Sequence, residues 1–175
     1  MAVTLAAASP GMAAPGGARA PEPTTDGVVA KILAEHPDAV RANRHDVVFP
    51  DGTRVSVHLD APAVGEARVS GQYDCLYGAL CLFPNKDFGG KYIGWDTGAA
   101  NTCRDFDLTR WSASNWASSI VNNRPSGTVS TFWDNTNSTG LIGYQHAYGF
   151  RQNLAFDTAS IGGTWDNRIS SMRVC

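Results

Sequence analysis

Four cysteines are the residues whose type and spacing bear most directly on chemistry. Cys75, Cys81, Cys103 and Cys175 contain no C-x-x-C pair, so their spacing does not match a zinc ribbon. An even number of widely spaced cysteines is typical of disulfides in an exported protein. Spacing alone leaves the pairing open. We favour Cys75–Cys81, because these residues are close in sequence and would clamp the first strand. Cys103–Cys175 would then tie the C-terminal strand back to the first half of the domain.

The remaining candidates for catalysis are few. Residues 72–175 carry eight Lys and Arg, eight Asp, no Glu and one histidine, His146. This excludes a zinc site built from several histidines in that segment, and a Ser-His-Asp triad could use only His146. A paired-carboxylate glycosidase site needs two Asp, and because eight are available that class is not formally excluded. We therefore expect a binding protein that needs no cofactor, and not an enzyme.

Composition narrows the class of partner. The formal net charge of the 175 residues is −2, which argues against a nucleic-acid binder. No apolar run approaches the roughly 18–20 residues that span a bilayer, so we expect no membrane insertion. Of the 17 aromatic residues, 16 follow Gly71, whereas all three Glu precede it. This asymmetry predicts a polar leader followed by one aromatic-rich domain, which we expect to be a monomer.

The first 72 residues divide into three segments. Residues 1–25 are rich in small apolar residues and contain an A-x-A pattern at residues 18–20, which is typical of a signal peptide; a disordered tail is the alternative. Residues 26–60 predict a helix capped by Asp26 and ended by Pro37, followed by a β-hairpin turning at residues 50–52. This arm is either a removable pro-segment or a support that docks on the domain. Residues 61–72 are predicted to be a linker.

Residues 73–175 predict an all-β domain that contains an internal repeat. Short aromatic or β-branched runs alternate with Gly, Asn and Ser, and helical periodicity is absent. In each repeat an aromatic residue is followed seven positions later by a glycine, and a serine comes later in the unit. The glycine would supply a positive φ in a bent hairpin, the aromatic ring would cover the bend, and the serine would bond the unpaired hairpin backbone. These residues are Phe83, Gly90 and Ser119 in the first unit and Trp133, Gly140 and Ser171 in the second.

This order of residues resembles the βγ-crystallin motif, which ends in a run (Asn/Asp)-(Asn/Asp)-x-x-(Ser/Thr)-Ser. Residues 166–171 match the run fully, whereas Ser114 stands where the first unit should have Asn or Asp. In the second unit, Ser138 replaces the inner aromatic that the first unit has at Phe88. The resemblance implies a double Greek-key sandwich of two four-stranded units, preceded by the helix-plus-hairpin arm.

A narrower resemblance concerns the residues from Cys75 to Phe83, the strand at 118–123 and the closing strand at 166–174. These are similar to secreted actinomycete proteins of the proteinaceous metalloproteinase (peptidase) inhibitor family. The resemblance implies a secreted inhibitor that inserts an exposed loop into an extracellular protease. The family's second disulfide loop, which presents the reactive bond, is missing here. The loop candidates are therefore Arg124 in 122–127 and Tyr144, Gln145, His146 and Tyr148 in 144–150.

Two alternatives to inhibition remain, of which the resemblance implies the first and the tryptophans suggest the second. A weak Ca²⁺ site would use the Asp166 and Ser170 side chains with the Arg168 carbonyl, and a poorer one would use Asn115 and Ser118. Without inhibition, such a protein would be a calcium-binding structural module. A carbohydrate- or cell-wall-binding module is the third class, in which exposed tryptophans would stack on sugars. The candidate rings are Trp95, Trp111, Trp116, Trp133 and Trp165.

Overall fold

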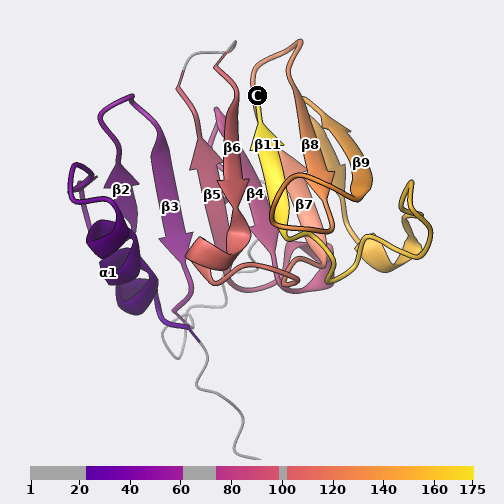
Figure 1. The fold of residues 1–175 in the computed structure, drawn as a ribbon, viewed down its shortest axis with the longest axis horizontal. Helices are drawn as coiled ribbons and strands as arrows, with labels where there is room; N and C mark the ends of the chain where they lie inside the picture. Colours follow the sequence, from indigo (N-terminus) through magenta and orange to yellow (C-terminus); the bar gives the residue numbers. More distant parts are fainter. Residues whose placement is uncertain (1–22, 61–73, 99–101) are drawn as a thin grey trace, which may run out of the picture.

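Two antiparallel β-sheets packed face to face, with one α-helix near the N-terminus, make up the computed structural model (Figure 1). It describes residues 23–60, 74–98 and 102–175. The predicted leader (1–25) and linker (61–72) therefore lie almost wholly outside the described residues. The elements are α1 (Thr25–Glu35), β1 (Val40–Arg41), β2 (Asp46–Val48), β3 (Arg54–His58), β4 (Ala79–Phe83), η2 (Lys86–Phe88), β5 (Tyr92–Asp96), β6 (Arg104–Asp107), η3 (Leu108–Trp111), β7 (Ser119–Asn122), β8 (Val129–Trp133), β9 (Leu141–His146), β10 (Gly149–Arg151), η4 (Leu154–Phe156) and β11 (Ser171–Val174).

The two repeats exchange strands between the sheets. The seven-stranded sheet has the order β1-β2-β3-β5-β4-β7-β10, and the four-stranded sheet has the order β6-β11-β8-β9. The first repeat comprises β4 to β7 and the second β8 to β11. In each, the third strand (β6 or β10) lies in the sheet of the other repeat, while the fourth, first and second strands lie side by side. The predicted all-β class is confirmed.

The N-terminal arm shares its hydrophobic core with the domain. Val28, Val29 and Ile32 of α1 are buried in the same cluster as Trp111 of η3. The Lys31 ammonium also donates to the Thr109 carbonyl at 3.0 Å. Figure 1 shows α1 beside β2 and β3 at one end of the sandwich. The helix therefore covers that end of the core.

The arm hairpin extends the larger sheet. Strands β2 and β3 pair as predicted, and β3 pairs with β5 from Arg54↔Asp96 to His58↔Tyr92. The predicted helix cap was wrong by two residues. Thr24 is the N-cap and its hydroxyl accepts from the Gly27 N–H at 3.2 Å, whereas Asp26 lies in the first turn. An acidic residue in the first turn still complements the helix dipole.

The bent hairpin predicted in the first repeat, with its aromatic, glycine and serine residues, is confirmed. The Ser119 hydroxyl accepts from the Phe88 N–H at 3.1 Å and donates to the Asn85 carbonyl at 2.6 Å. Gly90 has a φ of +80°, and the Phe83 ring covers the bend with its centroid 5.7 Å from that of Phe88. One hydroxyl from β7 thus satisfies two backbone groups of a hairpin that the strand ladder leaves unpaired.

The second repeat contains the same kind of bent hairpin. The Ser171 hydroxyl accepts from the Ser138 N–H at 3.3 Å and donates to the Asn135 carbonyl. Gly140 has a φ of +69°. The bend therefore survives replacement of the inner aromatic by Ser138. This equivalence confirms that the two segments are repeats of one structural unit.

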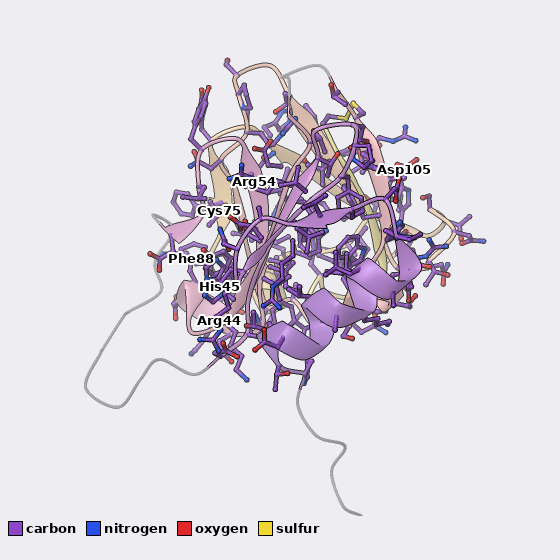
Figure 2. The ribbon with its side chains drawn as sticks, turned by 90° about the vertical axis from the view of Figure 1, so that its left-hand side faces the viewer. Arg44, His45, Arg54, Cys75, Phe88 and Asp105 are labelled. Atoms are coloured by element: carbon purple, nitrogen blue, oxygen red, sulfur yellow. A yellow bond between two sulfur atoms is a disulfide. The ribbon has the colours of Figure 1, made fainter. Side chains whose placement is uncertain are left out.

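Both favoured disulfides are present. Cys75 bonds Cys81, and Cys103 bonds Cys175 across 72 residues. The first bond lies in a small cluster with Phe83, Phe88 and Tyr92. This cluster is separate from the main core because alternate residues of β4 point to opposite faces of the sheet. Figure 2 places Cys75 and Phe88 on the opposite side of the sandwich from Asp105 of β6.

Candidate functional site

The hairpin between β9 and β10 presents exposed aromatic and imidazole side chains. Tyr144 and His146 are two residues apart on β9 and are both exposed, so they share its outer face. Tyr148 lies in the two-residue turn and is 58 % exposed. Its φ of +58° is in the left-handed region, which is uncommon for a bulky residue and stores local strain.

The two arms of this hairpin are held in different sheets. Strand β9 pairs with β8, whereas β10 pairs with β7. The Ala147 N–H donates to the Thr128 carbonyl at 3.1 Å, and the Asn122 amide donates to the Gln145 carbonyl at 2.8 Å. These bonds hold the turn in a single conformation before any partner arrives, which lowers the entropic cost of binding.

A second segment lies beside the hairpin tip, and no sequence pattern predicts it. Proximity to Tyr148 is the main cause that raises the pKa of Tyr77, and both side chains are exposed. Leu76 and Tyr77 are both exposed, and they follow directly on Cys75 of the first disulfide. No local pattern marks Tyr77, because its partner lies 71 positions further along the chain.

Arg124 does not belong to an exposed loop, and that prediction is wrong. Its side chain is fully buried and donates to the Gly78 and Cys175 carbonyls, both at 2.7 Å. It also forms an ion pair with Asp96 at 3.2 Å. Burial lowers the pKa of the guanidinium, and Asp96 opposes that effect. Arg124 therefore joins the start of β4, the end of β5 and the last residue of the chain.

Gln145 is also wrongly placed by the loop prediction. It alternates with Tyr144 and His146 on β9, so its side chain points inward and is only 8 % exposed. The amide packs so close to Gly149 that a Cβ there would lie 1.9 Å from Nε2. Of the four residues predicted for this loop, Tyr144, His146 and Tyr148 are therefore exposed.

The predicted calcium ligands are grouped differently from the expectation. Asp166 and Ser118, expected in separate sites, line one open groove of about 590 Å³ together with Asp87. Ser170, expected beside Asp166, donates instead to Asn115 at 2.9 Å. This exchange follows from the topology, since the hairpin loop of the first repeat meets the closing run of the second.

The remaining predicted ligands do not extend that groove. Ser170 also accepts from Ser114 at 3.1 Å, so three neutral side chains satisfy one another there. The Arg168 side chain pairs with Asp134 at 2.7 Å and donates to the Gly162 carbonyl at 2.5 Å. Within the described ranges, no three His, Cys, Asp or Glu side chains gather closely enough to hold a metal ion.

The tryptophans do not form a sugar-stacking surface. Trp95, Trp111 and Trp165 are buried in the main core. Trp116 and Trp133 are half-buried, and Trp116 packs against the same core. In the part of the chain that the structure describes, no helix is long and apolar enough to cross a membrane.

One family model matches part of the chain. Residues 69–145 match the model of peptidase inhibitor family I36. No curated protein and no solved structure matches the chain. The matched segment contains strands β4 to β8 and most of β9, so it includes the first repeat and half of the second. This confirms the resemblance to peptidase inhibitors, and because the family consists of inhibitors it indicates a protein that is not an enzyme.

Proposed function

We propose that the protein is a secreted, monomeric inhibitor of extracellular metallopeptidases and that it presents the β9–β10 hairpin tip to the peptidase cleft. The family match supports peptidase inhibition in general. The observation that favours this hairpin is Tyr148, an exposed aromatic residue at positive φ in a turn anchored in both sheets. Two disulfides fit an extracellular location.

The physical reason for choosing this loop is its combination of an aromatic anchor with rigidity. Tyrosine is enriched among the residues that dominate binding energy, because it buries a large area with few rotatable bonds. Tyr77 adds a second exposed aromatic side chain beside Tyr148 at this tip. A peptidase that meets this tip would therefore have little backbone to order.

We also infer that the domain is a double Greek-key sandwich of the βγ-crystallin type. The strand order supports this, because the fourth, first and second strands of each repeat are adjacent and the third crosses to the other sheet. In this architecture both repeats contribute to the hairpin's support, since β7 belongs to the first repeat and β8 to the second.

The experiment is a titration of a thermolysin-like extracellular metallopeptidase with the full chain and its variants. Tyr148→Ala should weaken inhibition by about a hundredfold, the loss expected for a central aromatic anchor. Val40→Ala is the matched control, because Val40 is 64 % exposed on β1, at the opposite edge of the sheet from β10. Equal inhibition constants for the parent and Tyr148→Ala would exclude this hairpin as the inhibitory loop.

A second candidate function is weak Ca²⁺ binding in the groove of Asp87, Ser118 and Asp166. The groove offers two carboxylates and a hydroxyl, which are hard oxygen ligands suited to Ca²⁺. The groove's two acidic residues contrast with the neutral cluster around Ser170, which offers no charge. At a site with a Kd of about 10⁻⁴ M, 1 mM Ca²⁺ should stabilise the fold by roughly 1.4 kcal/mol.

Thermal unfolding with and without Ca²⁺ tests this second candidate. Asp166→Asn should abolish the increase in Tm that Ca²⁺ produces. Asp105→Asn is the control, since Asp105 pairs with Arg173 on the outer surface of β6 and does not line the groove. If millimolar Ca²⁺ leaves the Tm of the parent protein unchanged, the groove does not bind Ca²⁺.

A further inference from the structure

A second open groove, of about 640 Å³, runs between the η2 loop and the η4 turn. Two phenylalanine rings flank it: Phe156 is 87 % exposed and Phe150 is 49 % exposed. Exposed large apolar side chains that lie together at a groove are typical of a binding surface. Phe150 lies on β10, one arm of the hairpin proposed for inhibition, whereas Phe156 lies outside that hairpin.

The backbone imposes the exposure of Phe156. The η4 turn is capped by the Asn153 side chain, which accepts from the Ala155 N–H at 3.1 Å. Leu154 is fully buried, and this anchors the turn so that Phe156 points outward. Phe150 is held edge-on by Phe88 at a centroid distance of 5.9 Å. The turn backbone therefore places Phe156 at the groove, and Phe88 packs against the Phe150 ring.

The lining of the groove contains an unused acceptor and an unused donor. Gln145 and Arg151 both line it. The buried Gln145 Oε1 and Arg151 Nε atoms have no hydrogen-bond partner among the described residues. Burying a polar atom without a partner costs free energy, so each unpaired buried atom in a folded protein needs an explanation. A ligand with hydroxyl groups could bond both atoms, since every hydroxyl both donates and accepts.

The charges of the groove cancel. Lys86 and Arg151 face Asp87 and Asp157, and Arg151 pairs with Asp157 at 2.6 Å. A groove without net charge gives no attraction to phosphates or other polyanions. It favours a neutral ligand that has both an apolar face and polar edges.

We propose that this groove binds a neutral saccharide. One sugar ring lays its flat C–H face on Phe156 and Phe150, and its hydroxyls bond Gln145 and Arg151 after a small rotation of those side chains. An apolar peptide side chain would gain most from an enclosed pocket, whereas this groove is open and has a polar lining. The site goes beyond peptidase inhibition and differs from the tryptophan surface expected from the sequence.

Calorimetric titration of the full chain with neutral tetrasaccharides tests the proposal. The probes are tetramers of β-1,4-glucose, α-1,4-glucose and β-1,4-N-acetylglucosamine, each at concentrations up to about 10 mM, where weak sites saturate. At least one should bind, and Phe156→Ala should weaken it about tenfold or more, as loss of a ring contact requires. Phe156→Trp should preserve binding. Ile161→Ala is the control, because Ile161 is exposed but does not line the groove.

Gln145→Leu separates a ligand-binding role from a structural one. Because the Gln145 Oε1 atom has no partner, an apolar residue of similar size should leave the Tm unchanged or raise it. The same variant should lose saccharide affinity. Retained affinity in Gln145→Leu would overturn the assignment of this side chain and with it the proposed lining.

The outcomes also separate this proposal from peptidase inhibition. Absence of binding to all three probes overturns the saccharide site, whatever the inhibition assay gives. If no probe binds but Phe156→Ala weakens peptidase inhibition, the groove is part of the peptidase contact and the proposal is wrong. Saccharide binding by a protein that inhibits no peptidase would support this site while refuting the proposed function.

Discussion

Replacing Ser119 with alanine should remove a large fraction of the protein's stability, although the change deletes a single oxygen atom. The Ser119 hydroxyl is fully buried, accepts from the Phe88 N–H at 3.1 Å and donates to the Asn85 carbonyl at 2.6 Å. Two hydrogen bonds contribute about 1 kcal/mol each, and leaving the Phe88 N–H buried without a partner adds about 1–2 kcal/mol. The free energy of unfolding should therefore fall by about 3–4 kcal/mol.

Urea denaturation followed by tryptophan fluorescence measures this loss. For a chain of this size, the same change corresponds to a decrease in Tm of roughly 6–15 °C. Ser171→Ala is the matched variant, because Ser171 makes the same two bonds in the second repeat. Ser171→Ala should also lower the free energy of unfolding, but by somewhat less, because the bond from the Ser138 N–H is longer, at 3.3 Å. A loss below about 0.5 kcal/mol for Ser119→Ala, the range of ordinary surface changes, would refute the role given to this hydroxyl.

Two further predictions concern packing and pH. Gly143→Ala should cost about 1–3 kcal/mol in a thermal or urea melt, because its Cβ would lie 2.3 Å from the buried Trp165 ring; an unchanged melt would show that the ring shifts freely. Burial lowers the pKa of His58, whose ring stacks between His45 at 4.3 Å and Tyr92 at 4.4 Å. The folded state therefore favours the neutral ring, and this stability is present above about pH 6.5 and is lost as the pH falls toward the lowered pKa. In melts from pH 8 to pH 5, the Tm of His58→Phe should fall less than the Tm of the parent. Equal decreases in Tm would show that His58 does not cause the loss of stability in acid.

Features marked by local sequence signals could be predicted from the sequence. Phe83, Gly90 and Ser119 each stand at a position where the backbone needs one residue type, and they recur in the second repeat. The disulfides followed from spacing and from the expectation that the last strand returns to the first half. The arm hairpin followed from alternating valines on either side of a turn.

Features that depend on distant partners could not be predicted. Arg124 carries a full charge in a segment with Pro and Gly, which is typical of a surface loop, yet carbonyls far away in sequence make its burial favourable. Asp166 meets Ser118 because two strands exchange sheets, and no local pattern reports that exchange. An aromatic residue after Leu154 looks like core, and only the turn geometry shows that Phe156 points outward.

The decisive measurement is the inhibition constant of the full chain toward a thermolysin-like extracellular metallopeptidase, beside that of Tyr148→Ala. If the protein inhibits such a peptidase through the hairpin tip, activity should fall in proportion to added protein and reach a minimum near one equivalent. Tyr148→Ala, with the fold intact by its melt, should need about a hundredfold more protein for the same effect. Full peptidase activity at excess protein, across several extracellular metallopeptidases, would show that the protein does not inhibit this class.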